Sequence, residues 1–137
     1  PGSGHGAYLH TIDTVVAPAI EAFKPDMIFI LSGFDAGAVD PLGRNMAHSG
    51  TYREMTLKMM SLADRFCKGK LLVMHEGGYS PAYTPFCGIS VVEALTGIDT
   101  GVKDPFFEIV SGYGMQELQP HQAEMIAQSA ALVKYIK

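Results

Sequence analysis

Two short, uninterrupted apolar runs constrain the fold of this chain more than any other feature of its sequence. They cover Met27–Leu31 and Leu71–Met74, and polar residues, glycine or proline stand on both sides of each. Runs of this length without polar alternation are typical of strands that are buried on both faces, as in parallel sheets. The sequence therefore predicts two such strands.

An amphipathic helix is predicted before each run. Tyr8–Phe23 has apolar residues at helical spacing, but Pro18 interrupts it, so we expect either one kinked helix or two short helices with Pro18 near the start of the second. Thr51–Lys68 repeats an apolar face and is closed by Gly69. The order helix, strand, helix, strand indicates an α/β domain with a parallel sheet flanked by helices.

The sequence after the second run predicts two more helices. Phe86–Thr96 is apolar enough for a buried helix that ends at Gly97, whereas Gly101–Leu118 has no clear period and is expected to be an irregular connection. Pro120–Ile136 is amphipathic, with five residues predicted to face inward: Ala123, Ile126, Ala127, Ala130 and Val133. No repeat or linker divides the 137 residues, so we expect one domain.

Charge and composition exclude several classes of protein. The net charge is −4, from 10 Lys and Arg against 14 Asp and Glu, and the Lys and Arg residues are scattered singly, so the sequence shows no basic segment for nucleic acid. No apolar run approaches the roughly 20 residues of a membrane span.

Cys67 and Cys87 lack the spacing of a zinc finger or a disulfide framework, so we expect a reducing cytoplasm. Because the chain begins at Pro1 without a methionine, we also expect further sequence before it.

The ends of the two predicted strands are the expected place for chemistry. In open parallel sheets, ligands bind beyond the carboxyl ends of the strands, where loops and helix N-termini converge. The first strand leads into Ser32–Ala36 and the second into His75–Tyr79, and both segments contain glycine that lets the backbone approach a ligand.

Three motifs at these strand ends carry a family resemblance. Gly33–Ala36 and Asp40–Gly43 follow the first strand, and Glu76–Tyr79 follows the second. In this order they resemble the C-terminal signature of class II histone deacetylases and their bacterial amidohydrolase relatives, with similarity from Pro1 to about Gly97. The resemblance implies an arginase/deacetylase-type α/β fold. Residues 1–137 would be the C-terminal part of a single catalytic domain, and residues 98–137 its tail and final helix.

The resemblance also implies roles for individual residues. Asp35 matches the family's carboxylate ligand of the catalytic zinc, and Tyr79 matches the tyrosine that hydrogen-bonds the substrate oxygen. Positions in or beside the acyl channel are implied for four residues: Phe34, Leu42, Gly77 and Gly78. The family's other zinc ligands, an Asp and a His two positions apart, and its acid–base pair of histidines have no match here. We therefore expect them upstream and expect this chain alone to be inactive.

The implied chemistry suits these residue types. A catalytic zinc takes three protein ligands and keeps an open position, where it polarises a carbonyl and lowers the pKa of bound water. The Tyr79 hydroxyl would donate to the developing oxyanion. We therefore expect a zinc-dependent deacetylase that acts on acetyl-lysine or an acetylpolyamine, as a homo-oligomer without direct nucleic-acid or membrane partners.

Simpler roles exist for the same residues when the resemblance is set aside. Asp35 could be a turn or helix-capping residue, and Tyr79 could pack with its hydroxyl hydrogen-bonded. We expect His75 to be a hydrogen-bonded core residue and Asp40 to cap or brace the loop after Asp35. The other histidines lack metal-ligand spacing and are not assigned to metal: His5, His10, His48 and His121.

Two other functions remain open from the sequence. Gly2–Gly6 before a helix could cradle a nucleotide phosphate, although no strand precedes it and its spacing is not G-x-G-x-x-G. The second is a non-catalytic interaction domain with the same fold. The presence of both Asp35 and Tyr79 argues against it.

Overall fold

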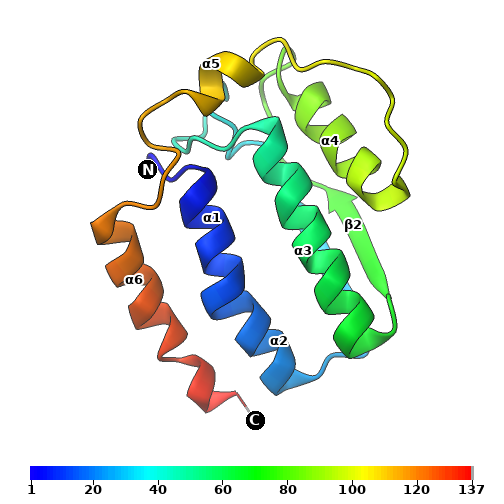
Figure 1. Cartoon of the computed structure of the whole chain (residues 1–137), viewed down its shortest axis with the longest axis vertical. Helices are drawn as coiled ribbons and strands as arrows, with labels where there is room; N and C mark the ends of the chain where they lie inside the picture. Colours follow the sequence, from blue (N-terminus) through cyan, green and yellow to red (C-terminus); the bar gives the residue numbers. More distant parts are fainter. Residues whose placement is uncertain (137) are drawn as a thin grey trace.

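The computed structural model describes residues 1–136 and confirms an α/β fold with a parallel sheet (Figure 1). The elements follow one another as α1 (His5–Thr11), a π-helical segment η1 (Ile12–Val16), α2 (Ala17–Phe23), β1 (Ile28–Ser32), α3 (Ser49–Cys67), β2 (Leu71–His75), α4 (Thr84–Thr96), α5 (Phe107–Ser111), α6 (Pro120–Ala130) and a 3-10 turn η2 (Val133–Tyr135). No helix within this described part is long and apolar enough to cross a membrane.

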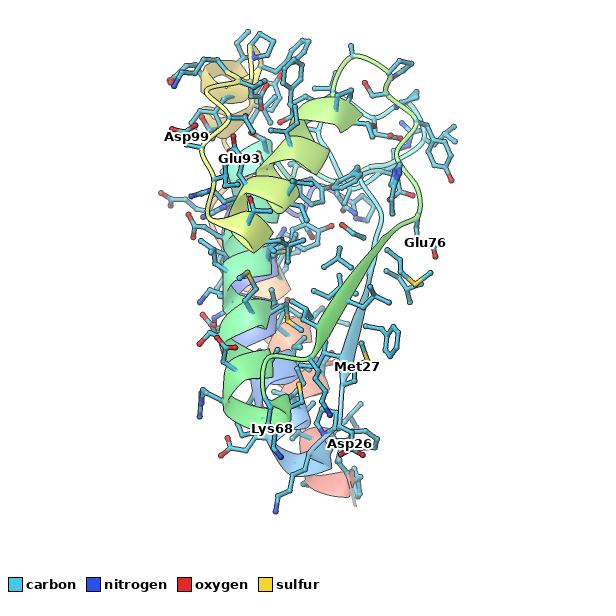
Figure 2. All side chains as sticks on the ribbon, turned by 90° about the vertical axis from the view of Figure 1, so that its right-hand side faces the viewer. Asp26, Met27, Lys68, Glu76, Glu93 and Asp99 are labelled. Carbon is cyan, nitrogen blue, oxygen red and sulfur yellow. The ribbon has the colours of Figure 1, made fainter. Side chains whose placement is uncertain are left out.

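The two strands pair in parallel, with Ile28 opposite Leu71 and Ser32 opposite His75. The prediction that both faces of the strands are buried is wrong for this chain. Ile28 is buried, whereas the side chain of Phe29 is 58% exposed and that of Leu31 is 67% exposed. Because successive side chains of a strand point to opposite faces, this alternation means that only one face of the sheet is covered. Figure 2 shows the strands running along one side of the helices.

The helical segment before β1 resolves the question raised by Pro18. Residues 5–23 are helical throughout, and η1 lies between α1 and α2, with the Ala17 N–H bonding to the Ile12 carbonyl five residues back. Pro18 falls at the start of α2, directly after this wider turn. Since proline has no N–H to donate, a π-turn just before it accommodates the missing hydrogen bond without ending the helix.

The main core lies where α3 and α4 meet the start of the loop after β1. Its buried side chains are Phe34, Ala47, Tyr52, Tyr83, Cys87 and Val91. The Tyr83 hydroxyl accepts a hydrogen bond from the Ser49 N–H at 3.2 Å, which joins the beginnings of the two helices. A second cluster under β1 contains Ile28, Ala63 and Cys67. The helices α3 and α4 agree with the sequence-based prediction, and α4 ends at Gly97 as expected. The helix α3 ends one residue earlier than expected, with Lys68 in the left-handed conformation at its C-cap.

The C-terminal segment contacts the start of the chain. Gln116 is buried, its Oε1 accepts from the His5 N–H at 2.9 Å, and its Nε2 donates to the carbonyls of Met46 at 2.7 Å and Val110 at 2.8 Å. The Gly6 N–H donates to the Gln116 carbonyl at 2.6 Å. These bonds occupy the first amides of α1, so the phosphate cradle considered at Gly2–Gly6 does not form.

The predictions for residues 101–136 were only partly right. The connection is irregular as expected except for the short helix α5. The last helix, α6, ends at Ala130 instead of Ile136, and only part of its expected inward face is buried: Ile126 is buried and Ala127 is exposed. Figure 1 shows α6 at the outer end of the row of helices, beside α1 and α2. Because a helix at the outer end has neighbours on one side only, it buries a narrow stripe of its side chains.

Candidate functional site at the carboxyl edge of the sheet

The parallel pairing continues past the ends of β1 and β2. The Glu76 N–H donates to the Ser32 carbonyl at 3.1 Å, and the Phe34 N–H donates to the Gly77 carbonyl at 2.8 Å. These two bonds hold the loop after β1 beside the loop after β2. Figure 2 shows Glu76 at this end of the sheet and Met27 at the opposite end. The two motif-bearing segments predicted from the sequence are thus brought together.

Three glycines surround Asp35. A Cβ atom built on Gly33 would lie 2.9 Å from Oδ1 of Asp35, and one on Gly77 would lie 2.6 Å from Oδ2. A Cβ on Gly43 would overlap the Asp35 carbonyl oxygen. The absence of side chains at these positions leaves the space that the Asp35 carboxylate and backbone occupy.

Asp40 connects the Asp35 loop to the Tyr79 segment. Its Oδ1 accepts from the N–H groups of Leu42 at 2.8 Å and Gly43 at 2.9 Å, and its Oδ2 accepts from the Tyr79 N–H at 2.7 Å. Burial opposes ionisation of Asp40, but the hydrogen bonds from Gly43, Tyr79 and Leu42 outweigh it and hold the pKa of this carboxyl below its ordinary value. The expected bracing role of Asp40 is confirmed, and it extends to a second loop that the sequence did not indicate.

Tyr79 presents its side chain at the surface of this edge. The side chain is 53% exposed, whereas the next residue, Ser80, is buried. Gly78 precedes it with φ of +133°, and a Cβ there would meet the Phe34 Cβ at 2.9 Å and Thr84 at 3.0 Å. A residue with a side chain would therefore be strained and crowded at position 78. This turn places Tyr79 two residues beyond the glycine that adjoins the Asp35 carboxylate.

The four residues predicted to line or adjoin an acyl channel lie at different depths at this edge. Leu42 is 67% exposed on the loop that Asp40 braces, and Gly77 and Gly78 form the turn before Tyr79. Phe34 is instead 6% exposed and packs edge-on against Tyr52, with ring centroids 5.1 Å apart. Phe34 therefore lies beneath the surface of this edge, and its proposed place beside the channel is below Gly77 and Gly78.

Two histidines, His75 and His48, lie in surroundings that the sequence did not predict. His75 is exposed, so its prediction as a core residue is wrong; its ring lies 5.2 Å from that of Phe34. His48, which the sequence did not single out, is buried, and its Nδ1 accepts from the Thr51 N–H at 3.2 Å to cap α3. Burial, and then the charge of the neighbouring His5, lowers the pKa of His48 to about 4. A neutral ring is what this cap requires.

Two tyrosines on the helical side of Asp35 were also missed. Burial raises the pKa of both Tyr8 and Tyr52, and the Asp35 charge adds to the effect as a smaller cause. The Tyr52 hydroxyl is buried and has no hydrogen-bond partner within residues 1–136. No sequence signal marks either residue, because their nearness to Asp35 arises from helix packing.

The side chains at this edge can supply one ligand of a metal site. Within residues 1–136, no group of three or more His, Cys, Asp or Glu side chains is arranged to hold a metal ion. Asp35 offers a single carboxylate at the strand end, in a space kept open by glycine. A catalytic zinc takes three protein ligands, so these residues fit zinc as a contributor of one ligand.

Comparison with known proteins identifies the family. The histone deacetylase domain model matches residues 1–95. A histone deacetylase-like amidohydrolase from Pseudomonas aeruginosa is 48% identical over 110 residues, which are 80% of this chain and 29% of that protein. A probable deacetylase from Archaeoglobus fulgidus is 31% identical over 107 residues, 77% of this chain and 30% of that protein. The chain thus spans about three-tenths of the length of these two relatives.

Solved structures agree with the sequence comparison. The structure of the histone deacetylase Clr3 matches with a TM-score of 0.79 at 25% identity, covering 100% of this chain and 21% of that one. The HDA15 HD domain matches with a TM-score of 0.74 at 25% identity, covering 98% of this chain and 32% of that one. The fold, the matched residues 1–95 and the relatives lead to one conclusion: the chain belongs to the histone deacetylase domain family.

Proposed function

We propose that this chain supplies one wall of the active site of a zinc-dependent deacetylase, as the C-terminal part of a single catalytic domain. The observation that carries the proposal is the placement of Asp35 and Tyr79 on two loops that are hydrogen-bonded side by side, in a chain of the histone deacetylase domain family. The substrate class is an acetylated amine, either acetyl-lysine or an acetylpolyamine.

Each residue has a separate task in this proposal. Asp35 would hold zinc, which when bound supplies electrophilic activation of the amide carbonyl and a water of lowered pKa. The exposed Tyr79 hydroxyl would donate a hydrogen bond to the oxyanion that develops on the substrate carbonyl oxygen. Leu42 would line the acyl channel, Gly77 and Gly78 would leave room beside it, and Phe34 would support them from below.

The proposal requires residues outside the present sequence. The other zinc ligands and the histidine acid–base pair would come from upstream sequence, so residues 1–137 alone should be inactive. Among the residues that the structure describes, no group of three or more His, Cys, Asp or Glu side chains is arranged to hold a metal ion, so Asp35 would need ligands from elsewhere. A cytoplasmic, homo-oligomeric protein with no direct nucleic-acid partner is the form we propose for the whole enzyme.

Substitution of Tyr79 and Asp35 in the full-length protein tests the proposal. Tyr79→Phe removes one oxyanion donor and should lower kcat by about 10² to 10³ with bound zinc retained. Asp35→Ala should lose zinc. Turnover is measured on an acetyl-lysine peptide and an acetylated polyamine, and zinc content by elemental analysis. Wild-type turnover of Tyr79→Phe on both substrates would reduce Tyr79 to a packing residue and refute the proposed role.

A further inference from the structure

Tyr79 has few means of fixing its own position. Its side chain is 53% exposed, and two glycines precede it, one of them at φ +133°. Glycine restricts the backbone less than any other residue, so the turn before Tyr79 has little intrinsic rigidity. A hydroxyl that must meet a developing charge has to be held within about 0.5 Å of its productive position. Some other contact must therefore supply the order.

That contact comes from across the site. The Tyr79 N–H donates to Oδ2 of Asp40 at 2.7 Å, a distance typical of a charge-assisted hydrogen bond. The other oxygen of the same carboxylate accepts from two N–H groups of the loop that carries Leu42. One side chain therefore joins the backbone of the proposed oxyanion donor to the backbone of the proposed channel residue.

We propose that Asp40 is a positioning residue that holds Tyr79 in its catalytic position by anchoring the Tyr79 amide to the Leu42 loop. This inference rests on the proposed role of Tyr79. Asp40 touches neither substrate nor metal in this account, and its effect passes through Tyr79. Both of its oxygens are needed, because Oδ1 is occupied by the loop and Oδ2 by Tyr79.

Substitution of Asp40 by asparagine tests whether both carboxylate oxygens are needed. Asp40→Asn keeps one acceptor oxygen, which can serve either the Leu42 loop or the Tyr79 N–H, whereas its NH₂ group cannot accept a hydrogen bond. A hydrogen bond to a charged group contributes about 1.5–3 kcal/mol, so its loss corresponds to roughly 10- to 100-fold. In the full-length protein, we expect kcat of Asp40→Asn to fall by that factor, with KM and zinc content close to wild type.

A double-mutant cycle decides whether the effect passes through Tyr79. Asp40→Asn is combined with Tyr79→Phe, and kcat is measured for both single variants and the double variant. If Asp40 acts by placing the Tyr79 hydroxyl, the double variant should resemble Tyr79→Phe alone within about threefold. Hydrogen exchange of the segment 76–83 should also be faster in Asp40→Asn, since the Tyr79 amide then competes with the Leu42 loop for one acceptor oxygen.

A matched control is available in the same chain. Oδ1 of Asp99 accepts from the Gly101 N–H at 2.8 Å in an exposed turn, which is the same local hydrogen bond as that between Asp40 and Leu42. Asp99→Asn should leave kcat and the exchange of segment 76–83 unchanged. If Asp40→Asn is too unstable to assay, Asp40→Glu replaces it in the cycle, since its longer stem displaces the same carboxylate.

The possible results separate this inference from the proposed function. An equal loss of kcat from Asp40→Asn in the wild-type and Tyr79→Phe backgrounds would overturn the inference and leave the role of Tyr79 intact. Loss of zinc from Asp40→Asn would also overturn it, because the effect would then pass through the Asp35 loop. Unchanged turnover of Tyr79→Phe alone would instead refute the proposed function, and the inference with it.

Discussion

Asp35 occupies a space that exists because three neighbouring residues are glycines without a side chain. Gly33, Gly43 and Gly77 come from three different points of the sequence, and each would meet Asp35 if it carried a Cβ. The motifs around Asp35 and Tyr79 could be recognised from the sequence because they are contiguous. The proximity of Gly43 to the Asp35 carbonyl, and of Tyr52 to Asp35, could not, since it depends on how loops and helices pack.

Gly77→Ala tests this space at the scale of one methyl group. The added Cβ would lie 2.6 Å from Oδ2 of Asp35, so the carboxylate must move. Displacement of a ligand by its surroundings typically lowers metal affinity about 10- to 100-fold. We expect that loss for zinc in the full-length protein, measured by competition with a chelator. Gly114→Ala is the control, because nothing lies within 4 Å of its added Cβ; equal zinc affinities for the two variants would contradict the assignment of Asp35.

Among the helices and strands, the apolar runs located β1 and β2, and the helical spacing of apolar residues located α3 and α4, all to within a few residues. It could not show that one sheet face is uncovered. An apolar run is typical of a strand that is covered on both faces, but it does not show whether the covering residues belong to this chain. Nor could it choose between a kink and two helices at Pro18, which the π-turn settles through one backbone hydrogen bond. The role of His48 was missed because histidine is an uncommon cap.

The His48 cap predicts a pH dependence of stability. The pKa of His48 in the folded chain is about 4, below its ordinary value of 6.5, so the unfolded chain binds a proton more readily. The stability from this neutral cap is therefore complete above about pH 6.5 and is lost as the pH falls towards 4, by at most about 1.4 kcal/mol per pH unit.

The measurement is denaturant unfolding of the full-length protein between pH 4 and 7. His48→Asn keeps a capping oxygen that does not titrate and should flatten the slope in this window. His121→Asn, at an exposed position on α6, should not. Identical slopes in the wild type and His48→Asn would show that the cap does not titrate as described.

For the whole molecule, the exposed sheet face is the dominant feature. Phe29, Leu31, Leu72 and Met74 are exposed on it. Within residues 1–136, β1 and β2 pair only with each other, so each strand also has an unpaired edge. Exposed apolar patches and unpaired edges both favour association with other chains.

We therefore expect the chain produced alone to self-associate. Light scattering after size exclusion should give a mass that rises with concentration. Leu31→Lys, which places a charge on the exposed face, should shift the distribution towards the monomer. Ile98→Lys replaces an equally exposed apolar residue in the loop after α4 and should have no such effect. A concentration-independent monomer with protected strand amides would instead indicate an independently folding domain.

The buried side-chain amide of Gln116 constrains the order in which contacts can form while the chain is being synthesised. Its partners lie 111 and 70 residues earlier in the sequence, at His5 and Met46. A ribosome adds about 5–20 residues per second, so these partners emerge seconds before Gln116 does. The amides at the start of α1 must meanwhile be satisfied by water. The start of α1 is thus fixed late, although it is synthesised long before Gln116, and it remains open until the segment after α5 has been made.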